Sequence, residues 1–107
     1  MVRISILYPN STGSQFDMDY YINTHMPRSI ELLSAAPGFK GVSVERGVSG
    51  AAADVSPAFT AMCHYLFESV EAFLAAFMPH AAELQGDIPN YTDVAPTIQI
   101  NEVVISR

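Results

Sequence analysis

Residues with chemically active side chains gather in one short segment, residues 16–27. It contains Asp17, Tyr21 and His25 at intervals of four, so that on a helix they would lie along one side. A histidine can titrate near neutral pH and act as an acid or a base, while a tyrosine hydroxyl can orient it or hold a substrate oxygen. The spacing therefore predicts a proton-transfer site, with His25 and Tyr21 as its catalytic residues.

The same residues also have a purely structural interpretation. Asp17 is a good N-cap for a helix, and Phe16 before it can pack on Tyr21 as a hydrophobic staple. His25 can simply bond a loop carbonyl. The spacing alone does not decide between a reactive site and the start of a helix.

Residues elsewhere in the sequence are candidates for substrate binding. His64 lies in the apolar stretch 59–67, where it either joins His25 in one pocket or serves as a core or interface histidine. The second role is favoured, because buried histidines usually only satisfy hydrogen bonds. Asp87 and Tyr91 can line the mouth of a pocket, although Asp87 suits a turn or a cap equally well.

Metal and cofactor motifs are not evident. The three histidines lack a close metal-binding spacing, and the sequence has no phosphate-binding glycine loop, nucleophile elbow or cysteine pair. We therefore expect no metal and no cofactor. Haem bound axially by His25 is a minor alternative, which the scarcity of basic residues for haem propionates disfavours.

The elements that would position these residues follow from hydrophobic periodicity. Alternating residues predict a strand from Val2 to Tyr8. A helix then begins at Asp17 and ends before Gly38, and Pro27 predicts a kink near His25. The stripe that this helix should bury is made of apolar residues at helical spacing, namely Met18, Ile22, Met26, Ile30 and Leu33.

The rest of the chain adds strands at residues 39–48, 59–67 and 97–106, and a second helix that Ser69 caps and Pro79 bends or restarts. The resulting βαββαβ order predicts an α+β, ferredoxin-like fold, with two helices on one face of a four-stranded antiparallel sheet. The stretch 59–67 is apolar on both sides, so the second face of the sheet should pack against another copy.

Composition limits the possible partners and the compartment. The 107 residues predict one domain, 1–107, and a net charge of −6 with five Lys and Arg disfavours nucleic acids and anionic membranes. No segment has the features of a leader or a membrane span. The single cysteine, Cys63, favours a reducing cytoplasm.

Two segments resemble a known family. The run F-D-M-D-Y-Y-I-N-T-H-M-P at 16–27 is similar to the first helix of the EthD family, named for ethyl tert-butyl ether degradation, and residues 86–93 with the strand after them resemble its tail. The resemblance implies a homodimeric α+β barrel. The family motif is matched at Asp17, Tyr20, Tyr21, His25 and Pro27, and it favours His25 as an acid or base facing a pocket between helix and sheet.

What the resemblance implies about activity is broader. Fungal relatives dehydrate or decarboxylate aromatic polyketides, and the wider barrel superfamily includes cofactor-free monooxygenases, lactone isomerases and haem-handling proteins. We therefore expect a cofactor-independent enzyme for a small hydrophobic or aromatic oxygenated compound. The alternatives are a non-catalytic binding or accessory protein for a hydrophobic metabolite, and a purely structural protein without a pocket.

Overall fold

Four antiparallel strands form one sheet in the order β2-β3-β1-β4, in a computed structural model that describes all of residues 1–107. Their bounds are Val2–Pro9 for β1, Phe39–Arg46 for β2, Phe59–Phe67 for β3 and Thr97–Glu102 for β4. The central strand pair is β3 with β1, in which Ile4 lies opposite Tyr65 and Tyr8 opposite Ala61.

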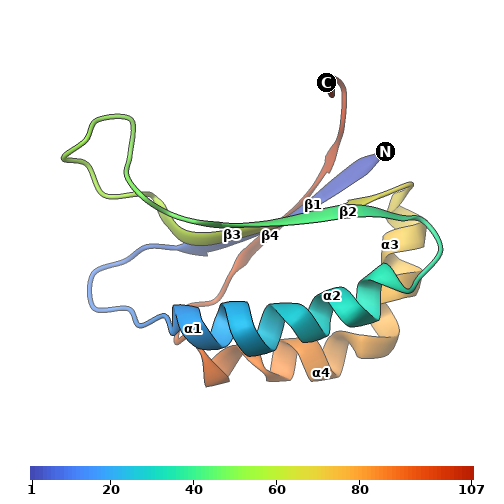
Figure 1. Cartoon of the computed structure of the whole chain (residues 1–107), viewed down its shortest axis with the longest axis horizontal. Helices are drawn as coiled ribbons and strands as arrows, with labels where there is room; N and C mark the ends of the chain where they lie inside the picture. The colour runs from blue at the N-terminus through green and yellow to red at the C-terminus, as the bar shows by residue number, and fades with distance from the viewer.

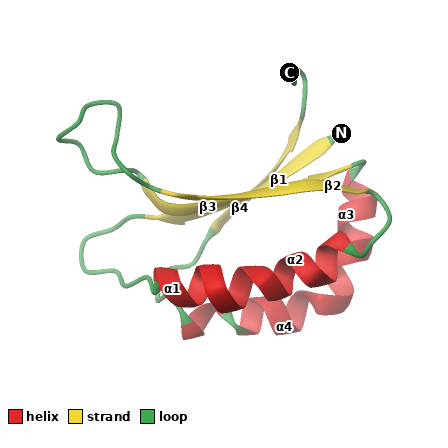
Figure 2. Ribbon diagram, in the orientation of Figure 1, coloured by secondary structure: helices red, strands yellow, loops and turns green.

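Two helical segments cover one face of this sheet and leave the other face open (Figure 1). The first runs through α1 (Met18–Tyr20), η1 (Tyr21–His25) and α2 (Met26–Ser34). The second runs through α3 (Val70–Phe77), η2 (Met78–His80), α4 (Ala81–Gly86) and η3 (Ile88–Asn90). This arrangement confirms the α+β, ferredoxin-like fold (Figure 2). None of the helices combines the length and apolarity that a membrane span requires.

Local chemistry starts both helices where the sequence predicts. The carboxylate of Asp17 accepts the backbone N–H of Tyr20 at 3.0 Å, and the Phe16 ring packs edge-on against Tyr21 with centroids 5.1 Å apart. The hydroxyl of Ser69 accepts the N–H of Ala72 at 3.1 Å. These contacts confirm the two predicted caps and the staple.

The disturbance predicted at Pro27 takes the form of a wide π-helical turn, η1, in which the N–H of Met26 reaches back to the carbonyl of Tyr21. Such a turn changes which side chains face the sheet. Ile22, predicted to be buried, is therefore 41% exposed. The predicted stripe is wrong in this respect, and the buried residues of the helix are Tyr21, His25, Met26, Ser29 and Leu33.

The open face of the sheet is more polar than expected. On β3 the side chains buried under the helices alternate with four half-buried ones on the open face, Thr60, Met62, His64 and Leu66. Polar residues of the neighbouring strands, such as Ser5 and Gln99, share that face. The prediction of an apolar second face is therefore only partly correct.

The last strand is shorter than the predicted span 97–106. β4 ends at Glu102 because its only neighbour, β1, begins at Val2, and the last backbone bond there joins the Val103 N–H to the Met1 carbonyl at 3.0 Å. Beyond it the chain leaves the sheet on the side away from the helices (Figure 1), and Val104 is 81% exposed. The second strand likewise ends at Arg46 rather than at residue 48.

Candidate functional site

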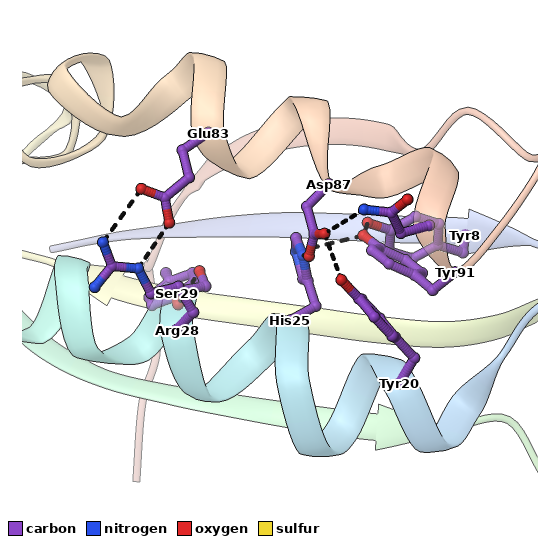
Figure 3. A network of polar contacts seen from close by, with 10 residues as sticks. Tyr8, Tyr20, His25, Arg28, Ser29, Glu83, Asp87 and Tyr91 are labelled. Atoms are coloured by element: carbon purple, nitrogen blue, oxygen red, sulfur yellow. Dashed lines mark hydrogen bonds and ion pairs between the residues drawn. The ribbon is translucent and has the colours of Figure 1, made fainter.

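His25 is the centre of a buried polar cluster between the first helix and the segment after α4. The residue is only 7% exposed, and its Nδ1 lies 2.9 Å from Oδ2 of Asp87 (Figure 3). Asp87 directly follows α4, so the bond joins residues that are 62 positions apart in the chain. It fixes the ring of a potential acid or base in one orientation.

Asp87 is itself held by two further donors on its other oxygen. The hydroxyl of Tyr20 donates to Oδ1 at 2.6 Å, and the side-chain amide of Asn90 donates to the same atom at 2.8 Å. Burial of the carboxyl works to raise its pKa, but the hydrogen bonds from Tyr20, Asn90 and His25 outweigh it and lower the pKa of Asp87 below its usual value. Because an ionised carboxylate only accepts, His25 must donate from Nδ1.

The opposite edge of the His25 ring faces Tyr91, which in turn bonds a second tyrosine. The hydroxyl of Tyr91 lies 3.4 Å from Nε2, and the rings of the two residues are 4.6 Å apart at their centroids. The Tyr91 hydroxyl is also hydrogen-bonded to the hydroxyl of Tyr8, which comes from β1. His25 is thus bonded at both ring nitrogens, to a carboxylate on one side and to a pair of phenols on the other.

Backbone contacts bring these distant segments together. The N–H of Asp17 donates to the carbonyl of Tyr91 at 2.7 Å, and the hydroxyl of Thr92 donates to the carbonyl of Gln15 at 2.6 Å. An isolated bridge between Phe16 and Thr92 lies at the same point. The start of the first helix and the segment carrying Asp87 and Tyr91 are therefore fastened to each other.

A cavity of about 60 Å³, here named the inner cavity, lies between the helices and the sheet beside this cluster. Twelve of its sixteen lining residues are hydrophobic, and none is a Lys, Arg, Asp or Glu. It is too small to hold a haem group. The lining residues with polar side-chain atoms are Tyr8, Tyr21, His25, Ser29, Cys63, Tyr65 and Gln85.

His25 also borders a second, polar hollow on the surface, here named the outer hollow, together with Tyr20, Asp87 and Arg28. The guanidinium of Arg28 is engaged there by Glu83 at 2.7 Å, which ties α2 to α4. His25 therefore lies between a mostly apolar cavity on one side and a polar surface hollow on the other. A histidine in this place can exchange protons between the two.

The hydroxyl and thiol groups of the inner cavity are held in their neutral forms. Burial raises the pKa of Tyr8 to about 12, even though its bond to Tyr91 works to lower it. Burial likewise raises the pKa of Cys63 to about 12 and moves the pKa values of Tyr21 and Tyr65 above the usual value for tyrosine. At neutral pH the cavity therefore presents neutral phenols and a neutral thiol.

Of the two roles predicted for the Tyr21 hydroxyl, orienting His25 and holding a substrate oxygen, the structure does not support the first. The ring of Tyr21 stacks against His25, with centroids 5.9 Å apart and planes 13° from parallel, but its buried hydroxyl has no hydrogen-bond partner. Tyr21 therefore supports the imidazole by packing, and the carboxylate of Asp87 is the group that orients it.

The other predicted site residues divide between two parts of the fold. Tyr20, Asp87 and Tyr91 all bond within the cluster, whereas Asp17 is an exposed cap that does not line the inner cavity. His64 lies on the open face, where it bonds Ser5 at 2.7 Å and Glu45 at 3.1 Å, so it does not share a cavity with His25. No group of three or more His, Cys, Asp or Glu residues is placed to hold a metal ion.

Tyr8 is a member of the polar cluster that the sequence does not single out. It closes the alternating pattern Val2, Ile4, Ile6, Tyr8, which strand periodicity alone explains. A tyrosine as the last inward residue of a strand was the available signal, since a buried phenol usually needs a hydrogen-bond partner.

Comparison with known proteins defines the class and then the family. The fold is that of a ferredoxin-like α+β protein, and the model of the EthD domain matches residues 10–95. The chain belongs to the EthD family. An EthD-like protein from Ralstonia eutropha is 43% identical, with a TM-score of 0.89 over 99% of this chain and 94% of that one.

More distant solved structures share the fold alone. An ethyl tert-butyl ether degradation family protein from Bacillus halodurans is 20% identical, with a TM-score of 0.68 over 97% of this chain and 99% of that one. A hydroxynitrile lyase from Passiflora edulis is 21% identical, with a TM-score of 0.60 over 98% and 95%. No curated protein matches the sequence.

Replacement of Asp87 should show how much the cluster contributes to stability. Asp87→Asn is expected to lower the free energy of unfolding at pH 7 by roughly 1 to 3 kcal/mol, because three donors lose a charged acceptor. The folded pKa of Asp87 is lowered, so its contribution is full above the ordinary carboxyl pKa and is lost as the pH falls through the folded value. Urea unfolding of both proteins from pH 7 to pH 3 should show the difference shrinking below about pH 4.

Two matched variants complete this measurement. Asp54→Asn, in an exposed loop, should leave stability unchanged at every pH. Tyr21→Phe should cost nothing, because it removes a buried hydroxyl that bonds no partner. A pH-independent difference between Asp87→Asn and the wild type would contradict the ionised Asp87 described here.

Proposed function

We propose that this EthD protein is a cofactor-independent enzyme that moves a proton on a small hydrophobic or aromatic oxygenated compound, with His25 as the acid or base. The observation that carries the proposal is the 2.9 Å bond between Asp87 and His25 at the border of the inner cavity. A carboxylate that orients a histidine and balances its charge is a recurring arrangement in general acid–base catalysis.

The chemistry of the cluster follows from its protonation. Neutral His25 donates from Nδ1 to Asp87 and keeps the lone pair on Nε2, on the side of Tyr91 and Tyr8. When Nε2 accepts a proton, the imidazolium that forms lies against an ionised carboxylate, which stabilises it. The outer hollow then offers a route for the proton to water. The cluster supplies acid–base catalysis that dehydration, decarboxylation, isomerisation or oxygenation can all use.

The ligand class follows from the cavity lining. Its mostly hydrophobic residues, among them Ile6, Leu33 and Phe77, suit an apolar or aromatic molecule, and its few hydroxyls can bond an oxygen. We include Tyr21 as a packing support and Tyr20, Asp87 and Tyr91 as residues that hold His25. Asp17 and His64 are left out, since neither lines the inner cavity.

The second candidate is a binding or accessory protein that holds a hydrophobic metabolite in the same cavity without converting it. The modest volume and the absence of Lys, Arg, Asp and Glu from the lining favour this second candidate, because a small, mostly apolar cavity can bind a hydrophobic molecule without any catalytic group. The fold does not choose between the two, since the hydroxynitrile lyase that shares it is too distant to transfer an activity.

Hydrogen exchange on a simple ketone separates the two candidates. Acetophenone has exchangeable protons on its methyl carbon, and we expect the protein to accelerate their replacement by deuterium in heavy water, followed by NMR. His25→Gln should reduce the acceleration by about 100-fold or more, the usual contribution of a general base. His80→Gln, a histidine outside the inner cavity, is the matched control and should keep it.

Acetophenone that binds without faster exchange would instead support the binding-protein alternative. Binding can be followed separately by the shift of the His25 ring signals in the same samples. The two functions therefore give opposite results in one experiment.

We also propose that the domain, residues 1–107, forms a homodimer through the open face of its sheet and works in a reducing cytoplasm. Leu7, Met62 and Leu66 place apolar side chains on that face, and none of the three is fully buried. An uncovered sheet with such residues gains stability when a second sheet packs on it. Cys63, a buried free thiol, is consistent with a reducing compartment.

Sedimentation velocity at low micromolar concentration should give a dimer for the wild type. Met62→Lys, which puts a charge in the middle of the open face, should give a folded monomer, with circular dichroism as the test of folding. Leu74→Lys, on an exposed part of α3, is the control and should stay dimeric. A monomeric wild type would refute the proposed assembly.

A further inference from the structure

Four side chains form an unbroken series of hydrogen bonds from the outer hollow to the inner cavity. Asp87 bonds Nδ1 of His25 at 2.9 Å, Nε2 of His25 lies 3.4 Å from the Tyr91 hydroxyl, and that hydroxyl bonds the hydroxyl of Tyr8. Figure 3 shows His25, Asp87, Tyr91 and Tyr8 gathered in one place between the helices and the sheet. Tyr8 lines the inner cavity, whereas Tyr91 lies behind it.

We propose that this series is a proton relay that ends at the Tyr8 hydroxyl, and that the ligand it fits is a neutral molecule with an ionisable hydroxyl, such as a phenol or an enol. The inference deepens the function proposed above and rests on the same cavity. It assigns to Tyr8 the contact with the ligand oxygen and to His25 the role of proton acceptor at a distance.

The direction of the hydrogen bonds depends on the charge of His25. When His25 is neutral, Nε2 can only accept, so Tyr91 donates to His25 and Tyr8 donates to Tyr91. The oxygen of Tyr8 is then left with lone pairs toward the cavity. In this state the cavity offers an acceptor, which suits a ligand that donates a hydroxyl proton.

Protonation of His25 reverses the two bonds beyond Nε2, while Nδ1 continues to donate to Asp87. Nε2 then donates to Tyr91, Tyr91 donates to Tyr8, and the proton of Tyr8 turns toward the cavity. In this state the cavity offers a donor, which suits a carbonyl oxygen. The same pocket should therefore prefer a phenol when His25 is neutral and a ketone when His25 is charged.

The proton transfer balances without any further reactant. The ligand O–H bond breaks as a Tyr8 O–H bond forms, the original Tyr8 proton passes to Tyr91, and the original Tyr91 proton passes to Nε2 of His25. The ligand becomes an oxyanion and His25 an imidazolium beside Asp87. No electron is transferred, and both tyrosines end neutral.

The charges around the relay favour a neutral ligand over an anion. No Lys or Arg lines the inner cavity, so a carboxylate would be buried there without a permanent positive partner. The guanidinium of Arg28 lies in the outer hollow and is already paired with Glu83. Titratable groups from every neighbouring element surround His25. Those of its own helical segment are Tyr20, Tyr21 and Arg28, and those of the second segment and the residues after it are Glu83, Asp87 and Tyr91. The sheet contributes Tyr8 from β1 and Cys63 and Tyr65 from β3.

The test measures binding of three probes of similar size, phenol, acetophenone and toluene, at several pH values. The dissociation constants would be determined by NMR titration of the wild-type protein, and the pH at which His25 gains its proton would be read from the same spectra. We expect the ratio of the constants for phenol and acetophenone to change by roughly tenfold across that pH, from a preference for phenol above it to a preference for acetophenone below it. Toluene should bind equally well on both sides.

Variants separate the relay from direct contact with His25. Tyr8→Phe and Tyr91→Phe should each abolish the change of preference while toluene still binds, because each interrupts the series. Tyr65→Phe, which removes another cavity hydroxyl that bonds only Ser29, should keep it. Persistence of the change in Tyr8→Phe would overturn the relay.

The outcomes also distinguish this inference from the function on which it rests. A constant preference in the wild type would overturn the relay and leave the hydrogen-exchange test of His25 intact. Failure of all three probes to bind would overturn the relay together with the ligand role of the cavity.

Discussion

The bond between His25 and Asp87 is the constraint on which the rest of the site depends. It joins a turn of the first helical segment to the residue that follows α4, and it places a titratable ring between a mostly apolar cavity and a polar surface hollow. Tyr20 and Asn90 keep the carboxylate ionised and in place. This bond sets the tautomer of the neutral imidazole, and the tautomer in turn gives the bonds of Tyr91 and Tyr8 their direction.

The two helical segments bring His25 and Asp87 close enough to form this bond. The π-helical turn η1 places Tyr21 and His25 toward the sheet, at the cost of exposing Ile22. The bonds that fasten Asp17 to Tyr91 and Gln15 to Thr92 then bring the second segment within reach of the imidazole. The polar cluster is therefore a product of the fold as a whole, and a buried cluster of this kind is stable only when nearly every member is bonded.

Much of the fold could be predicted from the sequence because local chemistry determines it. Asp17 and Ser69 mark helix starts by their capping side chains, and alternating residues mark the strands. The π-helical turn could not be predicted, because a stripe such as Met18, Ile22 and Met26 assumes an ordinary helical period. The end of β4 at Glu102 depends on where its neighbour begins, which is a property of the assembled sheet.

The candidate site could be predicted only in part. The segment carrying His25 and the turn carrying Asp87 and Tyr91 were both found from their residue types, but their contact spans more than sixty residues and has no local signal. Tyr8 was missed because strand periodicity explains it fully. His64 could not be placed because β3 has apolar residues on both sides, and its bonds to Ser5 and Glu45 decide the question.

The most direct test of this account is the tautomer of neutral His25, measured by ¹⁵N NMR of the imidazole nitrogens at a pH where the ring is uncharged. The account predicts that the proton is on Nδ1, shared with Asp87, and that Nε2 carries the lone pair. A proton on Nε2 with a bare Nδ1 would contradict it, because Asp87 would then have no donor from the ring and the proposed acid–base role would lose its basis.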